Sequence, residues 1–293
     1  MQSNVTDLHV ESPDISHSLA IDLLRITMLV YSYGKELKLN RPDETVEEFV
    51  ENLKLSNAFD KLAISDTLKR VLLDVSENVP SGKLCKFISN TESDIQVGIT
   101  VCEENKRICV VFRGSESTTD WMYNLKIVKH HIRDGISVHS GFYNQLCDNN
   151  IYSEIVDTVK HLLDEYSGFQ IYVTGHSLGS ALGTLFGYLL SDEIPNDVVV
   201  VSFASPRVGN YKWKESFESK SNLKHYRITN KRDVITAVPY YKYYHVGNHI
   251  CLSDDSFSQK STRNWYDETV LTCWSVYEHA CDVYYSRLTK HKW

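Results

Sequence analysis

The sequence predicts an α/β fold in which a mostly parallel sheet is covered by helices on both faces, with a helical N-terminal segment in front of it. Two observations indicate this. From residue 95 onward, β-forming runs alternate with segments of helical periodicity, whereas the first 80 or so residues show helical periodicity alone. The 293 residues suffice for one large domain with an extra segment. We therefore divide the chain into residues 1–90, packed on the core, and a main domain of residues 91–293.

The first elements expected are helices, followed by a hairpin. Apolar residues recur at helical spacing from Ile15 to Leu37, and two amphipathic stretches follow at about residues 46–53 and 62–75. Pro80-Ser-Gly82 then interrupts the chain. After it, the β-forming runs at 95–102 and 107–113 flank a Glu-Glu-Asn-Lys turn, which predicts a β-hairpin.

The remaining elements follow from the same two periodicities. In chain order we expect a helix at 151–166, a strand at 169–174, a helix at 178–190, a strand at 197–204, a helix at 212–219, a strand at 223–229, a tyrosine-rich strand at 240–252 and a final helix at 272–288. Strands that alternate with helices in this way predict a sheet with helices on both faces.

Composition and charge exclude several classes of protein. The formal net charge is -7 and the Lys and Arg residues are scattered, so we expect no nucleic-acid partner. No run of 18 apolar residues occurs, so we expect no transmembrane segment. The seven cysteines lack zinc-ligand spacing, and we expect them to be reduced thiols, with no metal and no cofactor. Because the first residues are polar and do not read as a secretory signal, and because the cysteines are expected to be unpaired, we expect a cytoplasmic location.

The most informative motif is Gly175-His-Ser177-Leu-Gly179. A run of β-forming residues leads into it and small helix-forming residues follow. This is the form of a nucleophile elbow, in which a serine sits on a tight strand-to-helix turn and glycines on either side let the two backbones approach. The alternative is an ordinary glycine-rich loop. The flanking strand and helix patterns favour Ser177 as a candidate nucleophile.

A serine hydroxyl needs a histidine base, and a carboxylate to hold that base in the right tautomer. After an elbow of this kind the acid precedes the histidine along the chain. Asp233 directly follows a predicted strand and is favoured over Asp254 and Asp255, which lie in a later polar loop. Chain order allows either His279 or the pair His245 and His249 as the base.

Two further histidine sites are less suited to the role. Strand and turn geometry directs His176 away from Ser177, which favours a packing or hydrogen-bonding function. His130 and His131 are adjacent, and we expect them to form a solvated pair in a loop.

Attack on a carbonyl also needs donors for the oxyanion. The backbone N–H of Leu178, at the start of the elbow helix, is one. A second must come from a loop after an earlier strand, and Val111-Phe-Arg-Gly-Ser115 fits, because Gly114 permits a turn and Ser115 offers an N–H and a hydroxyl. An ordinary turn at the end of a strand is the alternative for this segment.

With these residues assembled, the chain resembles the fungal-type (class 3) lipases of the α/β-hydrolase superfamily over residues 95–290. The motifs that carry the resemblance are Val110–Ser115 with Asp120-Trp121 and Asn124-Leu125, His139-Ser-Gly-Phe142, Val173–Gly179, Ser205-Pro-Arg-Val-Gly-Asn210 and Asn230-Lys-Arg-Asp233. The sequence departs from the family where relatives often have Glu and Trp, at His249 and Cys251, and in its more helical first 90 residues.

The resemblance implies that Ser177, Asp233 and His279 form a catalytic triad and that Ser115 and Leu178 form the oxyanion hole. It implies that His245 belongs to a strand motif and is not the base, whereas Glu278-His279 and the following Tyr284 resemble the segment that carries the base. Residues 117–128 would be a lid whose apolar face includes Trp121, Met122, Tyr123, Leu125 and Ile127. A fixed place for these side chains in the core is the alternative.

The sequence therefore predicts a serine carboxylic-ester hydrolase without a cofactor. The function favoured is that of a lipase that cleaves acyl esters of glycerolipids through an acyl-enzyme on Ser177, with transient contact with a lipid surface. A phospholipase or a small-ester esterase is the alternative within enzymes. A non-catalytic scaffold of the same fold is the alternative outside them.

Overall fold

The computed structural model describes residues 14–32, 44–45, 82–90, 92–114, 127–261 and 275–293. Their strands are β1 (Glu44–Thr45), β2 (Lys83–Asn90), β3 (Ile95–Cys102), β4 (Arg107–Phe112), β5 (Lys129–Arg133), β6 (Ile136–His139), β7 (Gln170–His176), β8 (Val198–Phe203), β9 (Leu223–Asn230), β10 (Asn248–Leu252) and β11 (Phe257–Ser261). The helices are α1 (His17–Ser32), α6 (Ser140–Cys147), α7 (Ile151–Glu165), α8 (Leu178–Glu193), α9 (Tyr211–Glu218) and α10 (Cys281–Lys290), with short 3₁₀ turns η2 (Asp148–Asn150), η3 (Val234–Ala237) and η5 (Tyr277–His279).

One sheet organises the described residues. Its strand order is β1-β2-β3-β4-β7-β8-β9-β10-β11, and β5 pairs with β6 as a separate hairpin. The central strands β4, β7, β8, β9 and β10 are parallel, while β1 to β3 and β11 extend the two sides of the sheet in antiparallel pairs. The parallel centre matters most for function, because the carboxyl ends of its strands meet at one edge of the sheet.

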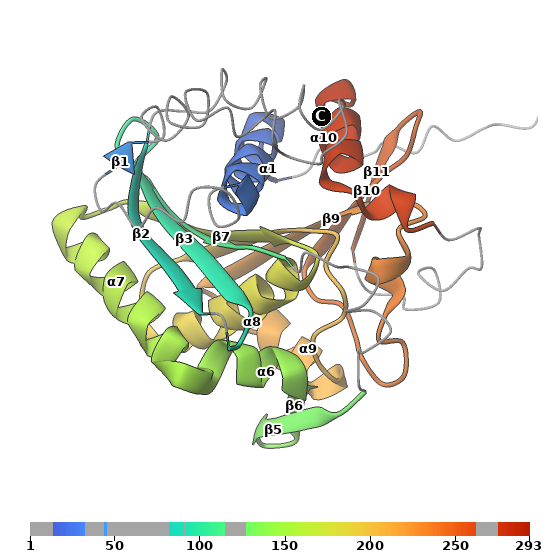
Figure 1. The fold of residues 1–293 in the computed structure, drawn as a ribbon. Helices are drawn as coiled ribbons and strands as arrows, with labels where there is room; N and C mark the ends of the chain where they lie inside the picture. Colours follow the sequence, from blue (N-terminus) through green and yellow to red (C-terminus); the bar gives the residue numbers. More distant parts are fainter. Residues whose placement is uncertain (1–13, 33–43, 46–81, 91, 115–126, 262–274) are drawn as a thin grey trace, which may run out of the picture.

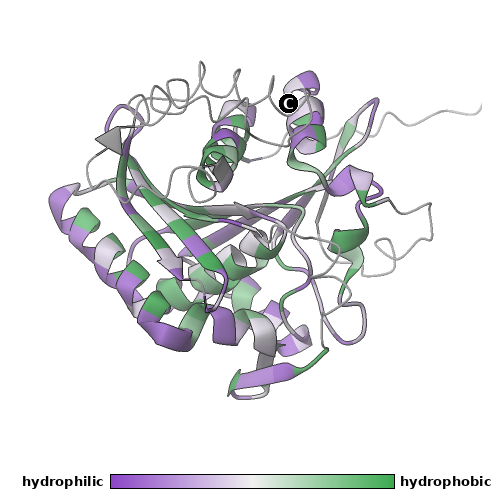
Figure 2. Ribbon diagram, viewed as in Figure 1, coloured by the Kyte–Doolittle hydropathy of each residue, from purple (hydrophilic) through white to green (hydrophobic). Residues whose placement is uncertain are grey.

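Helices cover both faces of the sheet. In Figure 1, α1 and α10 lie on one face and α6, α7, α8 and α9 on the other. Side chains alternate between the faces of a strand. Accordingly, Val110 and Phe112 of β4 join the core beneath α8, whereas Cys109 and Val111 join the core beneath α1 and α10. Figure 2 shows that α8 is largely hydrophobic, while α7 carries hydrophilic residues on its outer side. These two cores confirm the predicted α/β fold.

Several elements after residue 94 were predicted correctly. The hairpin β3–β4, the strand β7 with helix α8, and the strands β8 and β9 form where expected. Helix α1 covers His17–Ser32 of the first predicted helix, and the amphipathic stretches at 46–53 and 62–75 lie outside the described residues. In the described part of the chain, Cys102 and Cys109 are free thiols, as expected.

Three predictions at the ends of elements were wrong. Residues 83–90, placed in the helical segment, form strand β2, because Leu84 and Ile88 are buried against the sheet while the strand pairs with β3. The predicted strand at 240–252 begins only at Asn248, since the positive φ angles of Lys242 and Gly247 interrupt an extended chain. The last helix begins at Cys281, because Ala280 is extended. The division of the chain at residue 90 stays a prediction.

Candidate active site

The predicted elbow forms between β7 and α8. Ser177 has φ 59° and ψ −128°, a strained conformation for a residue other than glycine. Both neighbouring glycines are needed, because a Cβ on Gly175 would lie 2.6 Å from the backbone carbon of Gly179, and one on Gly179 would overlap the carbonyl oxygen of Phe112. The end of β4 therefore packs directly against the turn that carries Ser177.

Asp233 and His279 come together from segments 46 residues apart. Asp233 follows β9 and is fully buried, and His279 ends the turn η5. The ring nitrogen Nδ1 of His279 donates to the carboxylate of Asp233, at 2.9 Å from Oδ2 and 3.0 Å from Oδ1. A carboxylate only accepts hydrogen bonds, so the proton of the neutral ring lies on Nδ1. Nε2 of His279 is then the nitrogen that can take up a proton.

Two more donors hold the carboxylate of Asp233. The hydroxyl of Tyr284 donates to Oδ2 at 2.7 Å, and the backbone N–H of Ile235 donates to Oδ1 at 2.9 Å. Burial raises the pKa of Tyr284 well above its usual value, and the charge of Asp233 raises it further. Tyr284 therefore remains a neutral donor. Together with His279, these groups supply the hydrogen bonds that a buried carboxylate requires.

His176, which directly precedes Ser177, contacts His279. The ring of His176 is 4.7 Å from that of His279, centroid to centroid, and its Nε2 is 2.8 Å from the carbonyl oxygen of His279. Ser177 Oγ and His279 Nε2 are both buried, and neither has a hydrogen-bond partner within the described residues. The two atoms that would exchange a proton in nucleophilic catalysis are thus not engaged by other groups there.

The two alternative histidines form contacts with residues other than Asp233. His245 Nε2 donates to the carbonyl of Thr236 at 2.8 Å, and burial, with Arg227 and Arg207 nearby, holds the pKa of His245 well below its usual value. His249 Nε2 lies 2.7 Å from the hydroxyl of Thr229.

Two other predictions concern residues away from the elbow. Asp254 pairs with Arg287 at 2.6 Å, with 64% of its side chain exposed. His130 and His131 both lie on strand β5, so the prediction that they form a loop pair was wrong; His131 is exposed, whereas the ring of His130 stacks 3.7 Å from that of Tyr143. Stacking on the aromatic ring replaces the solvent on one face of the imidazole.

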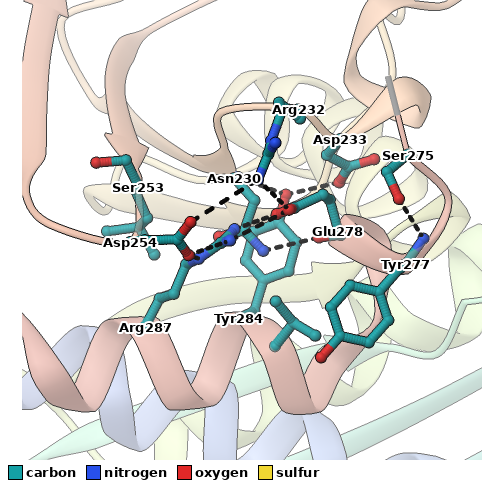
Figure 3. Close-up of polar contacts among 12 residues, drawn as sticks. Asn230, Arg232, Asp233, Ser253, Asp254, Ser275, Tyr277, Glu278, Tyr284 and Arg287 are labelled. Atoms are coloured by element: carbon teal, nitrogen blue, oxygen red, sulfur yellow. Dashed lines mark hydrogen bonds and ion pairs between the residues drawn. The ribbon is translucent and has the colours of Figure 1, made fainter. Parts of the chain in front are cut away.

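A charge network that sequence analysis missed holds the loops around Asp233 and His279. As Figure 3 shows, Arg232 and Arg287 converge on the carboxylate of Glu278, and both also reach Asp254. Arg232 directly precedes Asp233, and Glu278 directly precedes His279. The Arg232–Glu278 contact, 3.2 Å long, therefore ties the two loops to each other. The signal for this network in the sequence was the pair of opposite charges, Arg232 and Glu278, that directly precede the predicted acid and the predicted base.

Of the two predicted oxyanion donors, Leu178 lies within the described residues and Ser115 does not. Leu178 is the first residue of α8 and is 3% exposed, so its N–H belongs to the helix turn that lacks intrahelical acceptors. Ser115 lies outside the described residues, as do the lid residues Trp121, Met122, Tyr123 and Leu125. Gly114, directly before Ser115, packs on the elbow: a Cβ there would lie 2.6 Å from the carbonyl oxygen of His176.

A surface pocket of about 390 Å³ borders the first turn of α8. Leu178 and Gly141 form part of its wall, and the other lining residues are polar: Glu92, Ser93, Asp94, Gln145, Asp148 and Asn149. Within the described ranges, no group of three or more His, Cys, Asp or Glu side chains is placed to hold a metal ion. None of the helices described is long and apolar enough to cross a membrane.

Comparison with known proteins finds similarity to lipases. Residues 109–243 match the model of the family described as lipase (class 3). The chain is 32% identical over 178 residues to the chloroplastic galactolipase DONGLE of Arabidopsis thaliana, which covers 52% of this chain and 36% of that protein. It is 30% identical over 168 residues to the chloroplastic phospholipase A(1) DAD1 of the same plant, with 48% and 37% covered. The chain thus spans little more than a third of the length of these relatives.

Solved structures share the fold. The structure of the triacylglyceride lipase of Rhizomucor miehei superposes with a TM-score of 0.69 at 21% sequence identity, covering 89% of this chain and 92% of that one. At this level of identity the likeness concerns the fold alone.

The prediction of a cytoplasmic location was wrong. The two plant relatives are named as chloroplastic proteins. Free thiols indicate a reducing environment and do not identify a compartment, so cysteine usage could not support the assignment. Over residues 109–243 the chain is therefore similar to the lipase (class 3) family, and its fold is that of the lipase structure with which it superposes.

Proposed function

We propose that the protein is a serine carboxylic-ester hydrolase whose triad is Ser177, Asp233 and His279. One observation carries the proposal: Asp233 binds Nδ1 of His279, which leaves Nε2 as the basic nitrogen beside the strained elbow of Ser177. Such an arrangement of nucleophile, base and orienting acid is what acyl transfer by a serine requires.

In this proposal Ser177 Oγ attacks the ester carbonyl while His279 Nε2 takes up the hydroxyl proton. Asp233 stabilises the imidazolium that forms, and His279 then gives the proton to the leaving alcohol. Water cleaves the acyl-enzyme by the same route, and the acid product leaves. The N–H of Leu178, at the positive end of α8, stabilises the oxyanion, and we assign the second donor to Ser115.

For the substrate we propose acyl esters of glycerolipids. The names of the relatives support this class, since one is a galactolipase and another a phospholipase A(1). The polar pocket beside Leu178 lies next to the proposed oxyanion donor and offers room for a hydrophilic group of the substrate. We assign the cover of the acyl chain to the lid residues Trp121, Met122, Tyr123 and Leu125.

We also propose transient contact with a lipid surface. Tyr240 and Tyr241, in the loop that follows η3, are 71% and 57% exposed, and the ammonium of Lys242 lies 5.1 Å from the centre of the Tyr241 ring. Exposed tyrosines beside a lysine suit the interface between lipid headgroups and water. Lys129 lies close by, and burial together with the charge of Lys242 lowers the pKa of Lys129. This pair of cations gives the loop a positive character on an acidic protein.

The test is hydrolysis of p-nitrophenyl esters from acetate to palmitate and of emulsified glycerolipids. We expect Ser177→Ala and His279→Ala to lower kcat by up to roughly 10⁶-fold, and His245→Ala to retain most of the activity. A loss in His245→Ala equal to that in His279→Ala would overturn the assignment of the base. The profile of activity against acyl length separates a lipase from a small-ester esterase.

The rival proposal is a non-catalytic scaffold. It predicts that no ester or lipid is cleaved by the wild type above the Ser177→Ala background, on emulsions as well as in solution. The basic nitrogen of His279, with no partner in the described residues, argues against it, because a scaffold does not require that atom to be available.

A further inference from the structure

The N-terminal helix α1 reaches the elbow through Tyr31. This residue lies in the last turn of α1, and its hydroxyl is 3.2 Å from Nδ1 of His176, 145 residues later in the chain. Its ring meets that of His176 edge-on at 6.1 Å, and the guanidinium of Arg113 lies 6.0 Å from its centre. The same phenol oxygen contacts the backbone of Gly114.

The direction of each hydrogen bond follows from the chemistry of the partners. The carbonyl oxygen of His279 only accepts, so Nε2 of His176, 2.8 Å away, carries the proton and donates. Burial, reinforced by the neighbouring His279, holds the pKa of His176 well below its usual value. His176 is therefore neutral, its Nδ1 is an acceptor, and the hydroxyl of Tyr31 donates to it.

The phenol of Tyr31 is also an acceptor. The backbone amide of Gly114 donates to its oxygen, and this contact opposes the rise in the pKa of Tyr31 that burial causes. One chain of hydrogen bonds thus runs from the Gly114 N–H to Tyr31, on to His176, and from His176 to the carbonyl of His279. Each hydrogen bond in it has one donor and one acceptor.

This chain of hydrogen bonds joins three segments whose relative positions matter for the proposed reaction. Gly114 directly precedes the proposed oxyanion donor Ser115, and His176 directly precedes the nucleophile. His279 is the proposed base. A shift of about 1 Å in such groups can cost roughly 10²-fold in rate.

We propose that Tyr31 is a positioning residue that holds the end of β4, the elbow and the backbone of His279 in their reactive arrangement. This inference rests on the proposed function. It gives helix α1, which precedes the matched family region, a role in the chemistry.

The test is Tyr31→Phe, which keeps the ring and removes the hydroxyl. The Gly114 N–H and Nδ1 of His176 then both lose their partner. We expect kcat per active site to fall by roughly 10- to 100-fold with KM changed less than about 2-fold, because the oxyanion donors and the base act in the transition state. Active sites are counted by titration with an alkyl phosphonate, so that loss of folded protein does not enter kcat.

Tyr285→Phe is the matched control. Tyr285 lies on α10, where it is buried and accepts from Nε of Arg25 of α1 at 3.1 Å. We expect this variant to keep the wild-type kcat per titrated site even where its melting temperature drops. Equal kcat in Tyr31→Phe and the wild type would overturn the inference, as would an equal loss in both variants.

A second measurement does not depend on activity. Nitrogen-15 NMR of the histidine rings reports the tautomer of His176, which we expect as Nε2–H in the wild type and in Tyr285→Phe. In Tyr31→Phe we expect the same tautomer, because the carbonyl of His279 still accepts from Nε2, but a changed chemical shift of Nδ1, which no longer accepts a hydrogen bond. An unchanged Nδ1 shift in Tyr31→Phe would contradict the chain of hydrogen bonds, whereas a wild type no more active than Ser177→Ala would contradict the proposed function instead.

Discussion

The hydroxyl of Tyr284 donates to Oδ2 of Asp233 at 2.7 Å and accepts from the backbone amide of Asn230 at 2.9 Å. Tyr284 thereby links the end of β9 to α10 and shares the carboxylate with His279. Both contacts of the Tyr284 hydroxyl depend on helix α10, which begins after the proposed base His279.

Replacement of Tyr284 by Phe tests this link. The carboxylate of Asp233 loses a donor in a fully buried position, so we expect the free energy of unfolding to fall by about 2 kcal/mol. We also expect kcat to fall about tenfold, because the imidazolium is less well oriented. Urea unfolding and ester hydrolysis measure the two effects, and full stability with full activity in Tyr284→Phe would show that the contact contributes to neither.

Replacing Glu278 and replacing Asp254, the two carboxylates of the charge network, should lower the stability of the fold by very different amounts. The side chain of Glu278 is 6% exposed and that of its partner Arg287 is 10% exposed, whereas Asp254 is 64% exposed. Breaking a buried ion pair costs about 3 kcal/mol, and breaking a surface pair costs less than about 1 kcal/mol. We therefore expect Glu278→Gln to lower the urea midpoint far more than the matched change Asp254→Asn. Equal midpoints would mean that Arg287 is held by the protein without Glu278.

Stability should fall in acid because buried histidines resist protonation. Burial, and then the charge of Arg227, lowers the pKa of His225 to about 3. In the unfolded chain a histidine titrates near about 6.5. Between these two values the unfolded state binds a proton that the folded state does not, so the free energy of unfolding decreases as the pH falls from about 6.5 towards 3, by up to about 1.4 kcal/mol per pH unit.

The change His225→Gln removes this contribution. We expect the variant to lose less stability than the wild type between pH 7 and pH 5 in urea unfolding, even though its stability at pH 7 is lower because the 2.8 Å contact with Ser202 is altered. The exposed His161 provides the control, and His161→Gln should keep the wild-type slope. The same slope in all three proteins would exclude His225 as the source.

The loop at residues 240–242 should govern attachment to lipid. We expect the double change Tyr240→Ser and Tyr241→Ser to weaken binding to vesicles about tenfold, because two exposed rings no longer enter the headgroup region. Lys242→Glu should weaken binding to anionic vesicles more than to zwitterionic ones. Lys160→Glu makes the same charge change on α7, where Lys160 pairs with Glu193, and should have little effect. Vesicle flotation measures each variant, and unchanged flotation of the tyrosine variant would remove the loop from the proposed contact.

Much of the fold was predictable because its signals are local. The hairpin β3–β4 and the strands β7, β8 and β9 follow from runs of β-forming residues, and α7 and α8 from helical spacing. The ends of elements were less predictable. Residues 240–247 contain β-forming tyrosines, yet Lys242 and Gly247 adopt positive φ angles that propensity does not reveal.

In the candidate site, too, some residues were predictable from local sequence and others were not. Ser177 could be found because the elbow needs two glycines within four residues of chain, and Asp233 because it directly follows a strand. Residue patterns alone left His245 and His279 open as the base, and only the resemblance to a family favoured His279. In the structure His245 binds Thr236 and His279 binds Asp233, a choice made by the packing of η5 against the end of β9.

What the sequence by itself determined was the α/β class, the position of the elbow and the order of the candidate nucleophile, acid and base, because each depends on neighbouring residues. Tertiary structure alone decided that Tyr31 reaches His176 across 145 residues, that Tyr284 shares Asp233, and that Arg232 meets Glu278. Hydrogen bonds and ion pairs of this kind require contact within a few ångströms. The distance between residues that are far apart in the chain is set by the packing of whole helices on the sheet, and no local pattern encodes it.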